Sequence, residues 1–454
     1  MSTPSTNLSF REKAGFSAGE FGGSGLWQML MTYIGFFFTD VFGISAGVVA
    51  FMFLAVRIFD GVNDPIMGML SDRTETRHGK FRPYILWAAI PFGIIALALF
   101  WAPDLSDIGK VIYGYTTYTL MMVIYTVVMI PYSALSGVMT SDPQDRTSLN
   151  TFRFFGAFVA ALIAKTLYKP MVAFFGQGND VIGNRWTLAI FAIITVICFL
   201  IAFRSTRERV KAPKSERQSI LRDIAQLSKN GPWVIILILS LVSLIYICIK
   251  GGIQVFYFKY YVGGERDLFP LFIFLSSLST ILGVMTTTFW TKRFEKKNVL
   301  IASYALSSIF AGVFLFLRPD QVYLIFGFEI LAALTMGPIM PILWSMMADA
   351  ADYSEWKHGE RATGLVFSAS TMAFKMGVAI GGFISMGVLG LKGFVANQDQ
   401  SPEVLGAMKQ MVSVYPAAGG VICMIALTFY TLTNDRLKTI EEDLGGRRET
   451  AQAD

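Results

Sequence analysis

Charged residues are scarce in this chain. Only 15% of its 454 residues are Asp, Glu, Lys or Arg, whereas soluble domains carry about 25%. Hydrophobic residues make up 54% of the chain, and its mean hydropathy is +0.54. The composition therefore excludes a soluble globular protein and predicts an all-α membrane protein that crosses the bilayer many times.

Histidine and cysteine are also scarce. His78 and His358 lie in polar segments, so no histidine is expected inside the membrane to relay protons. Cys198, Cys248 and Cys423 fall in apolar stretches, at spacings that exclude a zinc site, and we expect them to be packing residues. The sequence predicts no cofactor, and any coupling chemistry is left to carboxylates and lysine.

Long apolar runs divide the chain into about twelve expected spans in two six-helix bundles. The expected cores are 15–39, 44–70, 83–102, 109–137, 151–176, 186–203, 233–262, 268–290, 298–317, 321–348, 363–391 and 412–433. A basic segment separates the two sets. The predicted domains are therefore an N-terminal bundle (1–203), a linker (204–231), a C-terminal bundle (232–433) and a tail (434–454).

Positive charge alternates between the loops. Basic residues follow the second and eighth spans and fill the linker, whereas residues 40–45 and 103–107 contain no Lys or Arg. The positive-inside rule then predicts that both termini and the linker are cytoplasmic. Because the basic residues lie in these loops, nucleic acid is not an expected partner. The N-terminal segment lacks the pattern of a signal peptide, so the first span is expected to be retained.

The second span contains the most informative residues. Asp60 and Asp64 are four residues apart, on one helical face, with Arg57 and Asn63 three residues to either side of Asp60. An ionised side chain in the hydrocarbon core costs roughly 2.5–3.5 kcal/mol, so such residues usually line a functional cavity. Carboxylate and amide oxygens are ligands for hard cations. A structural Arg–Asp pair would not need the second carboxylate, so we predict a cation site.

Other polar and aromatic side chains interrupt the spans. Lys375 is near the middle of the eleventh span and is expected to pair with Asp60 or Asp64. Aromatic faces beside hydrogen-bonding groups are typical of sugar sites. The candidates for sugar contact are Glu20, Ser24, Trp27, Tyr125, Lys250, Tyr257 and Trp344.

Six segments in this order resemble one transporter family over nearly the whole chain. They are FFFTDVFGIS, VRIFDGVNDPIMG, GKFRPYILW, MIPYSAL, DYSEWKHGERATGLVFS and TMAFKMG. The GxxxDR pattern at Gly68–Arg73 also resembles the signature loop of the major facilitator superfamily. The sequence is similar to the glycoside–pentoside–hexuronide:cation symporters of the major facilitator superfamily, including melibiose permeases and glucuronide carriers. The resemblance implies alternating-access import of a pentoside, hexoside or hexuronide with Na⁺ or H⁺.

The resemblance also implies roles for particular residues. The implied cation ligands are Asp60, Asn63, Asp64 and Thr126, with the two carboxylates holding Na⁺ if sodium is the coupling ion. The implied sugar-site residues are Arg153, Trp344, Thr371 and Lys375, which join Glu20, Ser24, Tyr125 and Lys250 among the predicted sugar-site residues. The implied coupling or gating residues are Arg57, Gly68, Asp72, Arg73, Asp352 and Arg361.

The chain departs from the galactoside-binding pattern of the family. Ser24 and Met129 stand where aspartates are expected, and Ser133 stands where a tryptophan is expected, so most galactoside contacts are missing. Glu20, one turn before Ser24, is expected to replace one acidic contact. Arg153, Lys250 and Lys375 together favour an acidic sugar, but neutral pentosides or β-glycosides fit equally well.

Three other functions remain open on the same scaffold: a uniporter, a sensor and a lipid carrier. An intramembrane hydrolase is disfavoured because aspartyl dyads bring one carboxylate from each of two helices, whereas Asp60 and Asp64 share one span. We therefore expect a transporter, not an enzyme. The expected location is a bacterial inner membrane, and the expected form is a monomer in the lipid bilayer.

Overall fold

The structure is a computed structural model that describes residues 8–140, 143–209, 230–263, 268–358 and 363–433, and short pieces of the tail at 436–437, 439–440 and 442–444. The chain forms two compact units. The first contains residues 1–215, 268–274 and 389–400, and the second contains 216–267, 275–388 and 401–454. The predicted boundaries at 203 and 232 stay predictions, because residues 210–229 lie outside the description.

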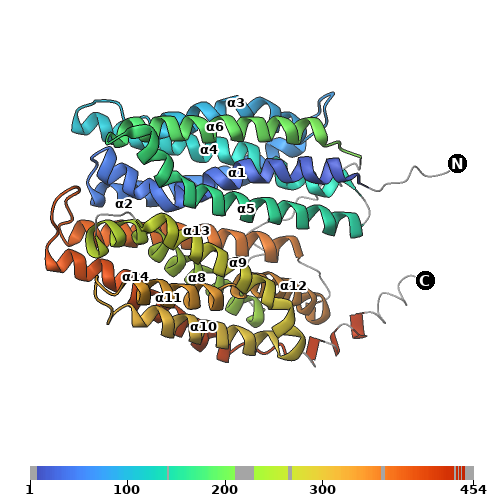
Figure 1. The fold of residues 1–454 in the computed structure, drawn as a ribbon. Coiled ribbons are helices and arrows are strands. Elements are labelled where there is room, and N and C mark those ends of the chain that lie inside the picture. The colour runs from blue at the N-terminus through green and yellow to red at the C-terminus, as the bar shows by residue number, and fades with distance from the viewer. Residues whose placement is uncertain are drawn as a thin grey trace. The chain divides into compact units, whose positions relative to one another are not determined.

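The first unit contains helices that lie lengthwise beside one another (Figure 1). They are α1 (Phe10–Phe36), η1 (Phe37–Val41), α2 (Ala46–Arg73), α3 (Arg82–Leu99), α4 (Asp107–Met139), α5 (Pro143–Gly176) and α6 (Asp180–Ser205). Helix α1 packs on α5 and α6, while α4 packs on α2 and α3. Helix α4 therefore lies beside α2, so that polar residues of the two helices can approach one another.

The second unit is also helical. Its elements are α8 (Gly231–Phe256), η2 (Tyr257–Val262), most of α9 (Phe269–Arg293), α10 (Lys296–Val313), α11 (Val322–Met336), α12 (Ile339–His358), most of α13 (Thr363–Leu391) and α14 (Pro402–Thr428). The tenth expected span is broken into α11 and α12 near Pro338, which has no N–H to donate. The all-helical, two-bundle fold is confirmed.

Short polar residues begin several of these helices. Ser9 accepts a hydrogen bond from the backbone N–H of Glu12 and receives the reciprocal cap from that side chain, a capping box. Ser106, Asn179 and Asn230 cap α4, α6 and α8 in the same way through one backbone N–H each. These local signals fix where the apolar helices start.

The two units repeat the same packing. In the first, α6 packs on α1 and α3, and α3 packs on α4; in the second, α14 packs on α8 and α10, and α10 packs on α11. Helices α1 and α8 both continue into a π-helical segment, and Gly43 and Gly263 follow with φ of 80° and 60°. Shared pairing and shared breaks support an internal duplication.

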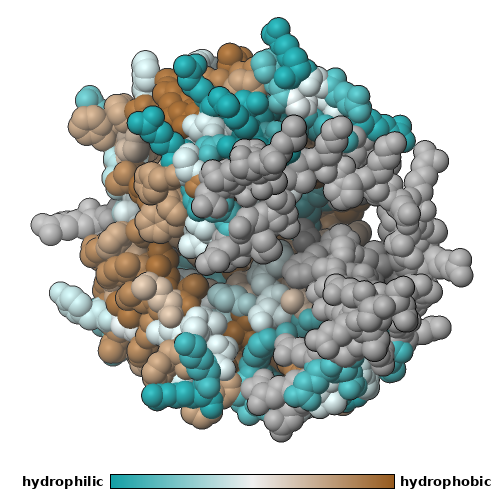
Figure 2. All heavy atoms as spheres, turned by 90° about the vertical axis from the view of Figure 1, so that its right-hand side faces the viewer, coloured by the Kyte–Doolittle hydropathy of each residue, from teal (hydrophilic) through white to brown (hydrophobic). Residues whose placement is uncertain are grey.

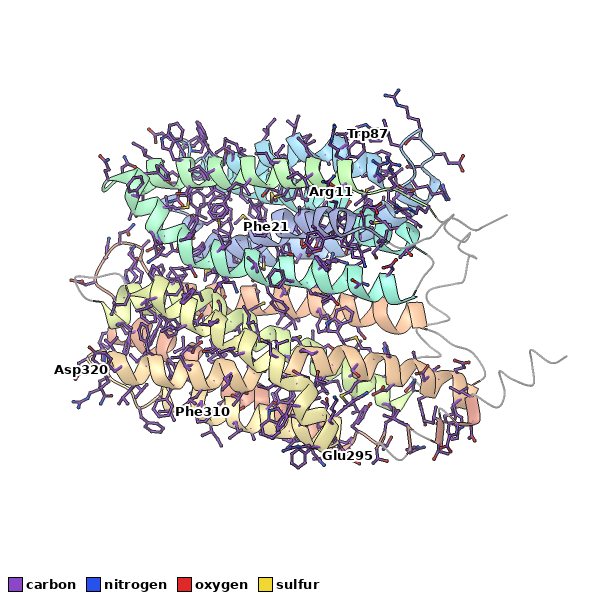
Figure 3. The ribbon with its side chains drawn as sticks, turned by 45° about the vertical axis from the view of Figure 1, so that its right-hand side comes forward. Arg11, Phe21, Trp87, Glu295, Phe310 and Asp320 are labelled. Carbon is purple, nitrogen blue, oxygen red and sulfur yellow. The ribbon has the colours of Figure 1, made fainter. Side chains whose placement is uncertain are left out.

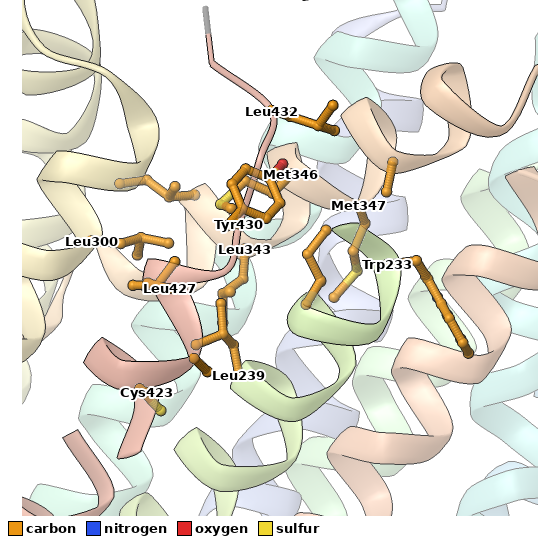
Figure 4. Close-up of a cluster of buried hydrophobic side chains, with 14 of the residues drawn as sticks. Trp233, Leu239, Leu300, Leu343, Met346, Met347, Cys423, Leu427, Tyr430 and Leu432 are labelled. Atoms are coloured by element: carbon orange, nitrogen blue, oxygen red, sulfur yellow. The ribbon is translucent and has the colours of Figure 1, made fainter. Parts of the chain in front are cut away.

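A buried apolar cluster joins α8, α10, α12 and α14 of the second unit. Trp233 and Leu239 of α8 pack with Leu300 of α10, Met346 of α12 and Leu427 of α14 (Figure 4). Burial of such side chains removes them from any polar contact and fixes the helices against one another. Cys423 lies in this cluster, as expected for a packing residue, and the three cysteines are free thiols.

Outer helix faces carry large apolar side chains. Trp87 on α3 is 58% exposed and points outward (Figure 3), and Ile94 on the same helix is 62% exposed. Figure 2 shows hydrophobic side chains along the left flank of one face and hydrophilic ones gathered toward its top. Ten segments among the described residues are long and apolar enough to cross a bilayer. Helices α1 and α10 are less apolar. Glycine and polar residues lower the mean hydropathy of α1, and the two lysines at the start of α10 lower that of α10.

Candidate functional site: an oxygen cluster between two helices

Helix α2 brings the two predicted carboxylates to the same place on α4. Thr126 Oγ1 lies 3.1 Å from Asp60 Oδ1 and 3.1 Å from Asp64 Oδ1. Asp60 and Thr126 are almost completely buried, with exposed fractions of 3% and 2%. Three oxygen atoms from two helices therefore converge on one point, which confirms the helical spacing but leaves their role a prediction.

The hydroxyl of Thr126 has a single proton to share between these two acceptors. When both carboxylates are ionised, one of the two 3.1 Å contacts must place lone pairs against each other unless positive charge lies nearby. A small cation or a proton relieves this repulsion. The arrangement thus has a built-in affinity for positive charge.

Arg57 supplies one positive charge beside the cluster. Its Nη1 lies 3.7 Å from Asp60 Oδ2, an ion pair too long for a hydrogen bond, and this Nη1 atom has no hydrogen-bond partner among the described residues. The guanidinium instead stacks over Trp27, 4.5 Å from the ring centroid, and donates to the sulfur of Met31 at 3.4 Å. Arg57 is therefore positioned largely by the ring of α1 rather than by Asp60.

Asn63 adds an amide to the same face of α2. Its Nδ2 is buried and has no hydrogen-bond partner in the described part of the chain. Nitrogen and oxygen of an amide are assigned by their surroundings, and rotation by a half-turn places the carbonyl oxygen there instead. An unsatisfied buried donor fits a position at which an oxygen ligand is needed.

The ligand types suit an alkali cation. The described residues contain no group of three His, Cys, Asp or Glu side chains that would hold a transition metal. Two carboxylates, a hydroxyl and an amide are hard oxygen ligands, which favour Na⁺ and similar ions over thiophilic metals. The cluster fits the predicted cation site.

A second polar cluster joins α1, α4 and α5. Arg153 Nε donates to Glu20 Oε2 at 2.6 Å, and Arg153 Nη2 donates to Ser133 Oγ at 3.0 Å. Ser24 Oγ donates to the other Glu20 oxygen at 2.5 Å. The structure thus brings together Glu20, Ser24 and Arg153, three of the predicted sugar residues, and pairs the arginine with a carboxylate.

Aromatic rings connect the two clusters. Trp27 and Tyr125 stack with their centroids 4.5 Å apart and their planes at 29°. Tyr125 directly precedes Thr126 in α4, and Trp27 also supports Arg57. A ligand that moves either ring also disturbs a neighbour of Asp60.

The second unit holds a buried ion pair that the sequence analysis missed. Lys250 Nζ of α8 lies 2.7 Å from Glu329 Oε2 of α11. Gln254 Nε2 and Ser276 Oγ donate to Glu329 Oε1 at 3.2 and 2.8 Å. Glu329 is 3% exposed. Its signal was present in the sequence as a lone carboxylate in the apolar run VYLIFGFEILAALTM.

The remaining predicted residues are less closely grouped. Trp344 is 44% exposed, with its ring 5.8 Å from that of Phe374, and Lys375 and Asp352 are partly buried on α13 and α12. The expected pairing of Lys375 with the aspartates of α2 stays a prediction.

The predicted gating role of the residues at the end of α2 stays a prediction. A Cβ built on Gly68 meets no described atom within 4 Å, and Arg73 is exposed at the end of α2. The side chains of Asp72 and Thr371, and the whole of Arg361, lie outside the residues that the structure describes.

Comparison with known proteins gives the chain relatives along its length. A family profile described as MFS/sugar transport protein matches residues 15–434. The putative glycoside/cation symporter YagG of Escherichia coli is 34% identical over 444 residues, covering 97% of this chain and 95% of that protein. The inner membrane symporter YicJ of the same organism is 33% identical over 448 residues, covering 98% and 97%. The isoprimeverose transporter of Lactiplantibacillus pentosus is 34% identical over 433 residues, covering 92% and 88%.

A solved structure shares the fold at much lower identity. The crystal structure of the nucleoside transporter NupG superposes with a TM-score of 0.63 at 13% identity, and the match covers 93% of this chain and 99% of that one. At this identity the likeness concerns the arrangement of the helices only.

Proposed function

Because this chain belongs to the glycoside–pentoside–hexuronide:cation symporter family of the major facilitator superfamily, we propose that it imports a neutral glycoside together with Na⁺ by alternating access. The family is one of cation-coupled transporters, not enzymes. Under this proposal the cation ligands are Asp60, Asn63, Asp64 and Thr126.

The observation that carries the choice of site is the shared hydroxyl of Thr126. Its one proton serves two carboxylate oxygens, each 3.1 Å away, so a cation among the three oxygens removes a repulsion that the empty cluster would have. The retained amide of Asn63 favours Na⁺, because a proton needs only one acceptor whereas a metal cation needs several oxygen ligands.

The pairing of the basic residues supports a neutral substrate. Arg153 is neutralised by Glu20 at 2.6 Å, and Lys250 is neutralised by Glu329 at 2.7 Å. Two of the three cations that favoured an acidic sugar are thus already compensated within their own units. The Trp27–Tyr125 stack and the hydroxyl of Ser24 provide an apolar face and a polar group for a neutral sugar.

Coupling follows from the same geometry. Cation binding stabilises one arrangement of α2 and α4 and, through Trp27 and Tyr125, the ring stack beside it. By thermodynamic linkage, sugar then raises the affinity for Na⁺ by the factor by which Na⁺ raises the affinity for sugar. We further propose a monomer in a bacterial inner membrane, with both termini cytoplasmic and with Lys375 and Trp344 facing the sugar.

Transport by reconstituted protein tests this proposal. Proteoliposomes are given an inward Na⁺ gradient, an inward H⁺ gradient or neither, and the uptake of labelled isoprimeverose is compared with that of a labelled glucuronide. We expect accumulation of the neutral sugar with the Na⁺ gradient. In Thr126→Val, which has nearly the same shape but no hydroxyl, the Na⁺ stimulation should disappear, whereas Thr126→Ser should keep it.

The other outcomes identify the alternatives. Equal uptake with and without gradients indicates a uniporter, and binding without any uptake indicates a sensor. Stimulation by H⁺ alone contradicts the choice of Na⁺, and preference for the glucuronide contradicts the choice of a neutral substrate.

A further inference from the structure

An apolar groove on the second unit lies apart from the polar clusters. It has a cavity volume of about 420 Å³. Trp290 and Phe294 line it from the end of α9, Ala302 and Leu306 from α10, and Leu334 and Pro338 from the junction of α11 and α12.

A glycine contact explains why the groove forms. Gly283 of α9 packs directly against Gly337, where a Cβ would lie 2.6 Å from the Gly283 carbonyl carbon. From this contact the lining positions Thr286, Trp290 and Phe294 follow at intervals of four residues toward the end of α9. They span about 12 Å, eight residues at ~1.5 Å each.

The wall of the groove is largely apolar, and two of its hydroxyl groups are already bonded to their own helices. Thr286 Oγ1 donates to the carbonyl oxygen of Gly283 at 2.7 Å, and Thr335 Oγ1 donates to that of Leu331 at 2.8 Å. Asn298 and Ser303 are the other polar residues of the lining. A sugar needs several hydrogen-bonding partners, whereas a hydrocarbon chain needs none, so this largely apolar wall suits an acyl chain.

Two exposed cations stand where the groove meets the end of α9. Lys296 and Lys297, which begin α10, already have partners: Lys296 pairs with Asp349 at 2.6 Å, and Lys297 donates to the carbonyl oxygen of Tyr430 at 2.9 Å. Lys292 and Arg293 have no carboxylate at ion-pair distance among the described residues, and the Arg293 guanidinium lies over the ring of Phe289, 4.3 Å from its centroid. Positive charge is therefore available beside an apolar slot.

We propose that this groove binds one acyl chain of an anionic phospholipid whose phosphate contacts Lys292 and Arg293. Bulk lipid tails are as apolar as the groove, so the preference for this lipid comes from the headgroup. Each basic side chain near an anionic headgroup contributes roughly fivefold to binding. Trp290 and Phe294, which are 42% and 53% exposed, lie beside the two cations. Their rings contact the part of the acyl chain nearest the headgroup.

Fluorescence quenching of Trp290 tests the proposal without reference to transport. The full chain is reconstituted in phosphatidylcholine that contains a low fraction of either brominated phosphatidylglycerol or brominated phosphatidylcholine. The signal of Trp290 is taken as the difference between the wild type and Trp290→Phe. We expect stronger quenching by the anionic lipid, a roughly fivefold smaller preference in Arg293→Gln, and loss of the preference in Ala302→Phe, which fills the groove.

Two variants serve as matched controls. Lys392→Gln removes an exposed cation elsewhere, and Ile309→Phe enlarges a side chain on α10 that is 61% exposed and outside the groove. Both should keep the preference. Equal quenching by the two lipids overturns the proposal, as does a preference that is undiminished in Arg293→Gln or that survives Ala302→Phe.

Discussion

The two units hold their buried charges in different ways. In the first, Asp60 and Asp64 share one hydroxyl at 3.1 Å, and the arginine beside them stays 3.7 Å from Asp60. In the second, Lys250 and Glu329 meet at 2.7 Å, and two more side chains donate to the same carboxylate. A duplicated scaffold thus carries two carboxylates that share one hydroxyl in the first unit, and one carboxylate paired directly with a lysine in the second.

The difference indicates which site is able to exchange its counter-charge. The ammonium of Lys250 is covalently part of the protein, so separating it from Glu329 would leave two unpaired charges buried, which is costly. A dissolved cation can leave Asp60 and Asp64, because water solvates it outside. Under the proposed function, the first unit therefore carries the exchangeable site, and the ion pair of the second unit holds α8, α9 and α11 together.

The largest expected effect is on stability in the second unit. Glu329→Gln leaves the Lys250 ammonium buried without a carboxylate, and breaking such a pair costs about 3–5 kcal/mol. We expect a strong fall in the apparent Tm of the detergent-solubilised protein. The double variant Lys250→Met with Glu329→Leu should recover most of this loss, because paired removal leaves no isolated charge.

A comparable variant in the first unit sharpens this contrast. Asp60→Asn should lower the Tm less than Glu329→Gln does, because Arg57 is also held by Trp27. Equal losses in the two variants would contradict the distinction between an exchangeable site and a fixed pair.

The next effect is on cation affinity. Removal of a residue that hydrogen-bonds to a metal ligand typically lowers metal affinity about 10–100-fold. Asp60→Asn changes a proposed ligand itself, so it should weaken Na⁺ binding by about 100-fold or more. Na⁺-dependent protection from thermal unfolding measures this directly. Asp104→Asn, which changes an exposed carboxylate of the same unit, is the control and should bind Na⁺ normally.

A smaller effect concerns the charge of the substrate. Glu20→Gln keeps the shape but releases the positive charge of Arg153, which Glu20 compensates at 2.6 Å. The ratio of affinities for an acidic over a neutral sugar should rise about tenfold, which corresponds to about 1.4 kcal/mol in the difference of their binding free energies. Competition against labelled sugar uptake gives this ratio. Ser24→Ala removes a hydroxyl of the proposed sugar site but no charge, so it should weaken the binding of both sugars to a similar degree and leave the ratio unchanged.

Much of the fold and part of the site follow from the sequence because the membrane restricts the choices. Apolar runs predict the helices, and Asp60 and Asp64 are prominent because ionised residues are rare in such runs. Glu329 carries the same signal and was predictable by the same rule. The pairing of Glu329 with Lys250 was not predictable, because which helices pack together depends on the whole bundle and not on local spacing.

Other features leave no local mark in the sequence. Thr126 was assigned only through the family resemblance, since threonine is common in apolar helices and its contact with α2 is tertiary. The π-helical segments η1 (FFTDV) and η2 (YFKYYV) contain no glycine or proline that would mark a break in the preceding α-helix. The pairing of Arg153 with Glu20 likewise requires α1 and α5 to be neighbours.

The smallest expected effect belongs to an ion pair near the water boundary, which sets a scale for the two buried sites. Lys13 Nζ donates to Asp145 Oδ1 at 2.8 Å, and the N–H of Leu8 donates to Oδ2 at 2.7 Å. The hydrogen bond from Lys13, together with that from Leu8, lowers the pKa of Asp145 below its usual value. A lowered folded-state pKa contributes stability above the ordinary carboxyl pKa of about 4, and this contribution is lost as the pH falls through the folded-state value.

Asp145→Asn should therefore lower the free energy of unfolding by about 1 kcal/mol or less at pH 7. The thermal unfolding temperatures of the variant and the wild type should converge as the pH falls below about 4. A loss at pH 7 as large as that of Glu329→Gln would remove the contrast between this partly buried pair and the more deeply buried one.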